Sequence, residues 1–142
     1  VAGTYFVQAG SVSPVAWWMT VPIGLLVVNL LVVNNLRDIH TDKIAGKYTL
    51  AVRLGAKNTR INYFVWLVIA YLIIPSLVFT RMLPPITLLV LISLPEALKL
   101  NHMVFSIEGK ALNPVLAATS RLALIFGMLF LISAILFRSI QF

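Results

Sequence analysis

Long apolar runs separated by short polar segments follow one another along most of the chain. Four of these runs are long enough, or nearly so, to cross a hydrocarbon core that requires about 20 helical residues. Pro95 and Glu96 interrupt the third run, so we expect one kinked helix that resumes over residues 97–105. The pattern predicts an all-α, polytopic membrane helical bundle whose transmembrane helices cover residues 15–33, 61–79, 82–94 with this continuation, and 121–137.

Polar side chains within these runs indicate how the helices pack. Asn29 lies well inside the first apolar run, and an amide in hydrocarbon needs a hydrogen-bond partner. We therefore expect Asn29 to face a neighbouring helix rather than lipid. Glu96 and Lys99 stand three residues apart, which predicts an ion pair on one helix face.

The composition agrees with a membrane location. Of the 142 residues, 61% are hydrophobic and only 11% are charged, and the mean hydropathy is +1.00. Soluble domains carry about a quarter charged residues, so we expect an integral membrane protein with the lipid bilayer as its solvent. The chain has no cysteine, which excludes a disulfide framework and a thiolate metal site. Any metal must be held by oxygen or imidazole.

The net charge of +7 is distributed unevenly. The basic residues gather in the segments 37–60 and 99–121, whereas the middle connection and the C-terminal end carry one each, Arg81 and Arg138. By the positive-inside rule, the loops at residues 37–60 and 99–120 face the cytoplasm, which fits an inner or plasma membrane. No aromatic-interleaved groove or recognition helix is present, so we expect no nucleic-acid partner.

The start of the chain indicates a piece of a longer protein. It opens Val-Ala-Gly-Thr without an initiator methionine, and residues 5–7 lack the charged flank of a signal peptide. Residues 1–13 are typical of the exit of a preceding helix followed by a short external loop. We expect a missing N-terminal half of the same protein.

Two of the four acidic residues lie where the first apolar run ends. Nothing before Gly46 breaks a helix, so the first helix should continue through Asp42. On such a helix Asn35, Asp38 and Asp42 fall within roughly 60° of one another, while Arg37 and His40 point away. Mg²⁺ takes one or two carboxylates together with substrate phosphates, which makes Asp38 and Asp42 candidate metal ligands.

Basic side chains follow this carboxylate pair. Lys43, Lys47 and Arg53 could contact the remaining charge of a bound diphosphate. The alternative is a solvated face on which Asp38 or Asp42 forms ion pairs with Lys43 or Lys47. A DxxxD motif by itself is weak and leaves both interpretations open. Zinc and hydrolytic chemistry have no candidate residues, because the histidines and serines are scattered and no HExxH is present.

The segment that carries this motif resembles a known family. Residues 32–55, VVNNLRDIHTDKIAGKYTLAVRLG, resemble the second aspartate-rich segment of the UbiA superfamily of membrane prenyltransferases. Within that superfamily they are most similar to the subfamily of 1,4-dihydroxy-2-naphthoate polyprenyltransferases. Residues 3–5, GTY, and residues 112–119, LNPVLAAT, resemble the same subfamily. The resemblance runs along nearly the whole chain.

The resemblance implies a fold and an activity. Residues 1–142 would be the C-terminal part of one UbiA-type domain, with helices six to nine of a nine-helix fold around a cavity. The activity would be Mg²⁺-dependent transfer of a polyprenyl group from polyprenyl diphosphate to 1,4-dihydroxy-2-naphthoate in menaquinone synthesis. Asp38 and Asp42 would be the catalytic, metal-binding residues, and Asn35, Lys47 and Arg53 would bind the diphosphate.

Other assignments stay open at this point. The aromatic acceptor could be 4-hydroxybenzoate or homogentisate, or the prenyl group could go to haem or a chlorophyllide. A non-enzymatic transporter or structural membrane subunit is the alternative from another class. The first aspartate-rich segment of the family is absent from these 142 residues. We therefore expect this chain alone to bind diphosphate weakly and to be inactive.

Overall fold

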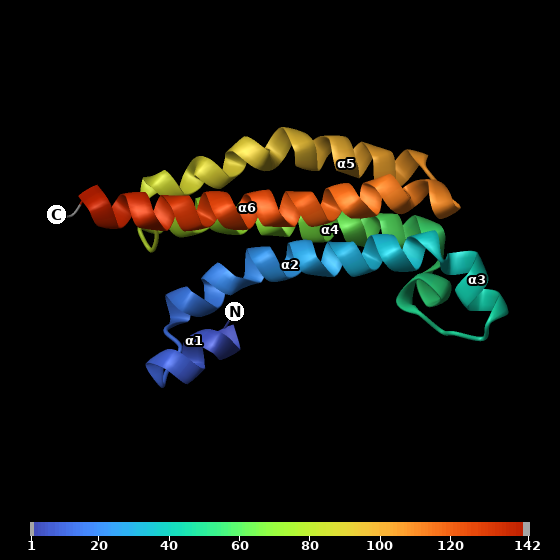
Figure 1. Cartoon of the computed structure of the whole chain (residues 1–142), viewed down its shortest axis with the longest axis horizontal. Helices are drawn as coiled ribbons and strands as arrows, with labels where there is room; N and C mark the ends of the chain where they lie inside the picture. The colour runs from blue at the N-terminus through green and yellow to red at the C-terminus, as the bar shows by residue number, and fades with distance from the viewer. Residues whose placement is uncertain (1, 141–142) are drawn as a thin grey trace.

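The computed structural model describes residues 2–140, and these residues form helices joined by short loops (Figure 1). No strand occurs among them. In chain order the elements are α1 (Ala2–Ala9), α2 (Pro14–Arg37), α3 (Ile39–Ile44), α4 (Leu50–Phe79), the 3₁₀-helix η1 (Pro85–Ser93), α5 (Leu94–Ser106), the 3₁₀-helix η2 (Gly109–Leu112) and α6 (Asn113–Ile140).

Four segments of the described chain are long and apolar enough to span a membrane: Pro14–Arg37, Leu50–Phe79, Pro85–Ser106 and Gly109–Phe137. The predicted all-α membrane bundle is therefore confirmed. The last helix begins at Asn113 rather than at Arg121, because Pro114 lacks only an N–H that the first turn of a helix leaves unbonded.

The third span has the kink that its interrupted apolar run predicts. Its first half, η1, is a 3₁₀-helix, and Pro95 then occupies the first turn of α5. The Ser93 hydroxyl lies at this change of helix type, 2.7 Å from the Tyr71 hydroxyl of α4. A polar contact inside the bundle thus holds the kinked span against its neighbour.

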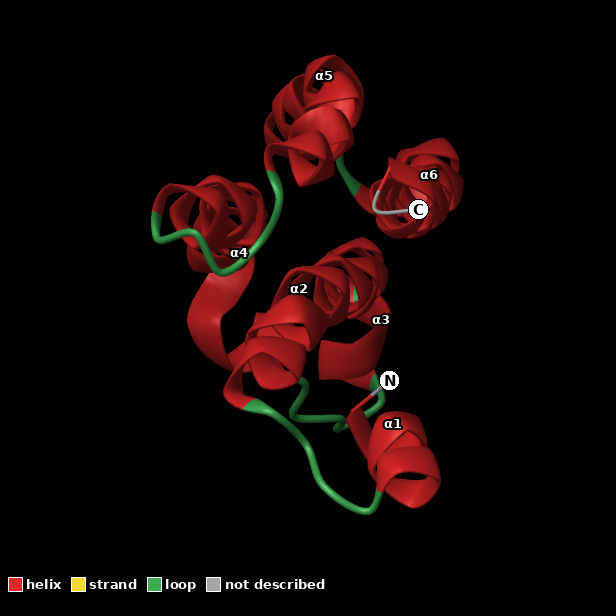
Figure 2. Cartoon of the chain, turned by 90° about the vertical axis from the view of Figure 1, so that its left-hand side faces the viewer, coloured by secondary structure: helices red, strands yellow, loops and turns green. Residues whose placement is uncertain are grey.

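The four spans pack side by side, as the end-on view shows (Figure 2), and they share one core of buried side chains. Leu26, Tyr63, Ile74 and Phe126 are among the fully buried side chains of this core. Asn29 is also fully buried, and its amide nitrogen donates to the backbone carbonyl of Tyr63 on α4 at 3.1 Å. Asn29 therefore faces a neighbouring helix, as its position inside an apolar run predicts.

Ionic residues gather at one end of this bundle, which we call the charged end. It comprises residues 37–60 and 96–121 (Figure 1). These ranges contain the last residue of α2, α3, the start of α4, all but the first two residues of α5, η2 and the first nine residues of α6. Nine of the eleven Lys and Arg residues and all four acidic residues lie in these two segments. The opposite end contains the turn between α4 and η1 and the loop between α1 and α2.

Candidate functional site

The two aspartates of the DxxxD motif lie at a break between two helices. The predicted unbroken helix through Asp42 is wrong at one residue, because α2 ends at Arg37 and α3 begins at Ile39. Asp38 lies between them with φ −95° and ψ 8°. The helical hydrogen bonds nevertheless continue across the break, since Asp38 N–H donates to Asn34 O at 3.1 Å and Asp42 N–H donates to Asp38 O at 2.8 Å.

The short helix α3 ends where the sequence predicts a stop. Gly46 has φ +69°, a left-handed conformation that glycine adopts without a Cβ clash. The N–H of Lys47 donates to Asp42 O at 2.9 Å, and the N–H of Gly46 donates to Lys43 O at 3.3 Å. This pair of bonds is a Schellman motif. It fixes the backbone of Lys47 directly beside the turn that carries Asp42.

Asp38 forms a two-bond ion pair with its sequence neighbour. Arg37 Nε and Nη2 donate to the two carboxylate oxygens of Asp38 at 2.8 and 2.6 Å. The prediction that Arg37 points away from Asp38 is therefore wrong. The hydrogen-bonded Arg37 guanidinium holds the pKa of Asp38 below its ordinary value, and the positive charge of Lys47 acts in the same direction. Asp38 is thus an ionised carboxylate at neutral pH.

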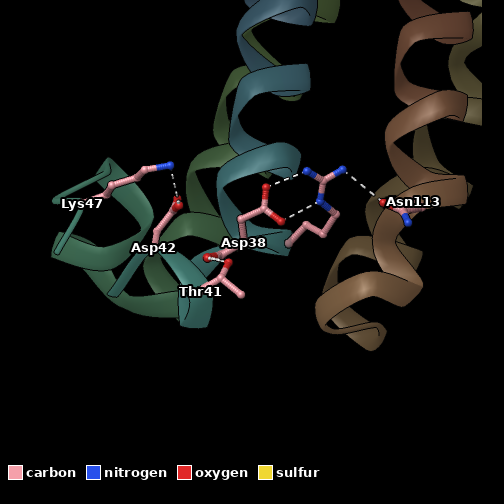
Figure 3. Close-up of polar contacts among 6 residues, drawn as sticks. Asp38, Thr41, Asp42, Lys47 and Asn113 are labelled. Atoms are coloured by element: carbon pink, nitrogen blue, oxygen red, sulfur yellow. Dashed lines mark hydrogen bonds and ion pairs between the residues drawn. The ribbon is translucent and has the colours of Figure 1, made fainter. Parts of the chain in front are cut away.

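Arg37 also joins α2 to the last helix. Its Nη1 donates to the side-chain oxygen of Asn113, the first residue of α6, at 3.1 Å (Figure 3). Sequence reasoning missed this contact, and only the family-like run at residues 112–119 drew attention to Asn113. The carboxylate of Asp38, the guanidinium and Asn113 form one chain of hydrogen bonds between segments 76 residues apart.

Asp42 is the more shielded of the two carboxylates. Its side chain is 15% exposed and lies 3.9 Å from Nζ of Lys47, whose side chain is 70% exposed. This is one of the ion pairs that the solvated-face interpretation predicts. The Lys47 ammonium is free to turn toward a stronger anion, because a pair at this distance with one exposed partner contributes little.

The remaining predicted site residues lie around the pair without bonding to it. Asn35 is half-buried near the end of α2, and Arg53 is exposed in the first turn of α4. Within the described residues no hydrogen bond or ion pair joins either of them to Asp38 or Asp42.

The donor chemistry fits Mg²⁺, but only as part of a site. No group of three or more His, Cys, Asp or Glu side chains able to hold a metal occurs among the described residues. The two carboxylates offer hard oxygen donors, and Mg²⁺ in proteins uses one or two of these with phosphate and water completing its shell. Asp38 and Asp42 can therefore share a metal with a phosphate ligand rather than enclose one.

Two further contacts build the charged end. Arg60 of α4 donates to the carbonyls of Val104 and Ile107 at 3.0 and 3.2 Å and to the Glu108 carboxylate at 2.9 Å. These bonds satisfy carbonyls that the end of α5 leaves without partners. The arginine also holds the pKa of Glu108 below its ordinary value. Sequence spacing could not predict this contact, since it joins residues more than 40 positions apart.

Glu96 pairs with a different partner than predicted. It accepts a hydrogen bond from Arg121 of α6 at 2.6 Å, not from Lys99 on its own helix. The guanidinium of a facing helix reaches the carboxylate more directly than a lysine one turn away. The pair ties α5 to α6 inside the charged end.

The sequence is similar to proteins of one enzyme family. The sequence profile of the UbiA prenyltransferase family matches residues 1–111. The chain is 35% identical over 133 residues to a 1,4-dihydroxy-2-naphthoate octaprenyltransferase from Haemophilus influenzae, and the match covers 92% of the chain and 42% of that relative. A protein of the same name from Mycobacterium tuberculosis is 40% identical over 130 residues, which cover 90% of the chain and 43% of the relative.

A human relative extends the same similarity. The UbiA prenyltransferase domain-containing protein 1 from Homo sapiens is 31% identical over 136 residues, which are 93% of the chain and 38% of that protein. The chain thus spans less than half the length of the curated relatives it matches. No solved structure matches it.

Proposed function

The chain belongs to the UbiA prenyltransferase family, and from this we propose that it is the C-terminal part of a 1,4-dihydroxy-2-naphthoate polyprenyltransferase of menaquinone synthesis. Its four spans are then helices six to nine of the family's nine-helix fold. The names of the bacterial relatives support the naphthoate as acceptor. The basic loops at 37–60 and 99–120 support a cytoplasmic charged end in an inner or plasma membrane.

One observation carries the site assignment: Asp38 and Asp42 stand four residues apart at the charged end, beside Arg37 and Lys47. Carboxylates together with cations are what a metal–diphosphate complex needs, because the metal requires oxygen ligands and the phosphates require positive charge. Mg²⁺, when bound by Asp38 and Asp42, supplies Lewis-acid neutralisation of the charge that develops on the leaving diphosphate.

The chain's own residues then have distinct tasks. The lowered pKa of Asp38 keeps its carboxylate ionised, which is the form that binds a cation. Lys47, held beside α3 by the Schellman motif, and Arg53 in the first turn of α4 contact the phosphate oxygens. Asn35 offers a neutral amide from the last turn of α2. Together they keep the diphosphate at the charged end while its polyprenyl tail extends toward the apolar part of the bundle.

The reaction follows from this placement. The allylic carbon–oxygen bond breaks, and its electron pair leaves with the diphosphate. The electron-rich naphthoate ring attacks the resulting carbocation through the ring carbon that carries the carboxylate. This carboxylate then leaves as carbon dioxide, and the ring becomes aromatic again. Apolar helix faces exclude the water that would otherwise capture the cation. The aromatic acceptor and the polyprenyl diphosphate are thus the two substrates.

A direct comparison of acceptors tests this proposal. The complete protein, purified and supplied with Mg²⁺ and a polyprenyl diphosphate, should prenylate 1,4-dihydroxy-2-naphthoate and leave 4-hydroxybenzoate largely unreacted. Preference for 4-hydroxybenzoate would be consistent with prenyltransferase activity but would refute the naphthoate as the acceptor. Absence of transfer to either acceptor, from protein that is folded and membrane-inserted, would refute the proposed activity as a whole.

A further inference from the structure

A cavity of about 490 Å³ opens between α5 and α6 and takes no residue from α2, α3 or α4. Four residues of each of the two helices line it. Three of them are charged, namely Glu96 and Lys99 of α5 and Arg121 of α6. The others are apolar, and the two alanines of α6 among them, Ala117 and Ala118, leave the space that larger side chains would fill.

The charged side chains that line this cavity give it a net charge of +1. Arg121 donates from Nη2 to Glu96 at 2.6 Å, while its side chain remains 62% exposed. A guanidinium has five N–H groups, so Arg121 can bind a second acceptor without releasing Glu96. Lys99 is exposed and forms no ion pair within residues 2–140. Two cations and one carboxylate sum to one net positive charge.

With α6 centred in a bilayer, the cavity lies where lipid headgroups meet hydrocarbon. The 28 residues of α6 span about 42 Å, some 12 Å more than the hydrocarbon core of a bilayer, so about 6 Å remains outside the core at each end. Arg121 stands eight residues into α6, or about 12 Å from its first residue. Long basic side chains at this depth extend toward the headgroups.

An exposed apolar surface continues from the cavity toward the membrane centre. Leu124 and Met128 follow Arg121 by three and seven residues, which places them on the same face of α6. Their side chains are 64% and 55% exposed. A ligand with an anionic head and an aliphatic tail would therefore meet suitable chemistry along its whole length.

We propose that the α5–α6 cavity binds the headgroup of an anionic glycerophospholipid. Its phosphodiester lies between Lys99 and Arg121, and its acyl chains lie over Leu124 and Met128. The single net charge of the cavity matches one phosphodiester, and Glu96 disfavours ligands with two negative charges at the same point. The lipid would brace α5 against α6 from the bilayer side, as Glu96 and Arg121 do directly.

Lipid titration followed by native mass spectrometry tests this site. The complete protein in detergent is titrated with phosphatidylglycerol or with phosphatidylcholine of identical acyl chains. Wild-type protein should bind phosphatidylglycerol more tightly, and Lys99→Gln should weaken its first binding step about tenfold, as the loss of one charged contact predicts. Lys57→Gln, which removes an exposed lysine from the same end of the bundle, should leave it unchanged.

Three results would overturn the proposal. Equal losses of affinity for phosphatidylglycerol in Lys99→Gln and Lys57→Gln would show that any positive charge at this end attracts the lipid, without a specific site. Displacement of the lipid by soluble glycerol phosphate would show that the ligand is a free phosphate rather than a lipid. A photoreactive residue at position 117 that crosslinks to another segment of the complete protein, and not to lipid, would show that protein fills the cavity.

Discussion

Arg37 donates two hydrogen bonds to the carboxylate of Asp38, its immediate neighbour in the chain, and the pair stands at the junction between α2 and α3. The same guanidinium bonds Asn113 on α6. The candidate metal ligand is therefore positioned by a residue that reaches a different transmembrane helix. Metal binding at Asp38 would compete with this guanidinium for the same oxygens.

Arg37→Gln should reveal how the pair depends on pH. The pKa of Asp38 is lowered in the folded protein, so the pair stabilises the fold above the unfolded pKa near 4 and loses this effect as the pH falls through the folded value. Both side chains are partly exposed, so the stabilisation is about 1 kcal/mol at most. Thermal unfolding of Arg37→Gln in detergent should fall below wild type at neutral pH, and the difference should narrow below about pH 4.

The contact between Arg37 and Asn113 gives this experiment its control. Asn113→Ala removes only the α2–α6 bond and should lower the free energy of unfolding by about 1 kcal/mol at every pH in the series. A difference in thermal unfolding between Arg37→Gln and wild type that stays constant down to pH 3 would instead show that the charge of Asp38 does not contribute to stability.

Gly46→Ala should weaken the turn that positions Lys47. The φ of +69° disfavours any residue with a Cβ, although nothing lies within 4 Å of a Cβ built there. The expected cost is about 1 kcal/mol, together with a raised KM for the prenyl diphosphate. Gly24→Ala is the matched control, because its Cβ also meets open space but its φ is ordinary. Equal stability and equal KM in the two variants would show that the turn at Gly46 does not position Lys47 for the diphosphate.

Arg60→Ala should loosen the end of α5 from α4. The substitution leaves two backbone carbonyls and one carboxylate without their donor, and the side chain of Arg60 is only 14% exposed. The free energy of unfolding should fall by about 2–3 kcal/mol. Glu108→Gln removes the most exposed of these contacts and should have little effect. Hydrogen exchange across residues 100–108 reports the loosening locally; exchange equal to wild type would refute the role given to Arg60.

The sequence was sufficient to predict the four spans, because a long apolar run in hydrocarbon must form a helix to satisfy its own backbone hydrogen bonds. The inward orientation of Asn29 followed from the same argument, since its amide needs a partner in the bundle. The stop at Gly46 was also readable, because a left-handed cap favours glycine. These features depend on local sequence and on the solvent that surrounds it.

Side-chain pairing was not predictable in the same way. Helical phase alone places Arg37 away from the face that carries Asp38, yet the long side chain of Arg37 reaches the carboxylate of its neighbour in the chain. Glu96 bonds Arg121 rather than Lys99 because the facing helix supplies a nearer donor. The first outcome depends on the side-chain conformation of Arg37 and the second on how α5 and α6 are set against one another, neither of which is encoded by spacing within one helix.

The most direct test of the proposed metal–diphosphate site is Mg²⁺-dependent prenyl transfer by the complete protein carrying Asp38→Asn, with Glu108→Gln as a control that removes an exposed charge from the same end. We expect Asp38→Asn to lower kcat at least about a hundredfold and to weaken the binding of Mn²⁺, used as a probe for Mg²⁺, while Glu108→Gln leaves both unchanged. Near wild-type turnover by Asp38→Asn would contradict the assignment of Asp38 as a metal ligand.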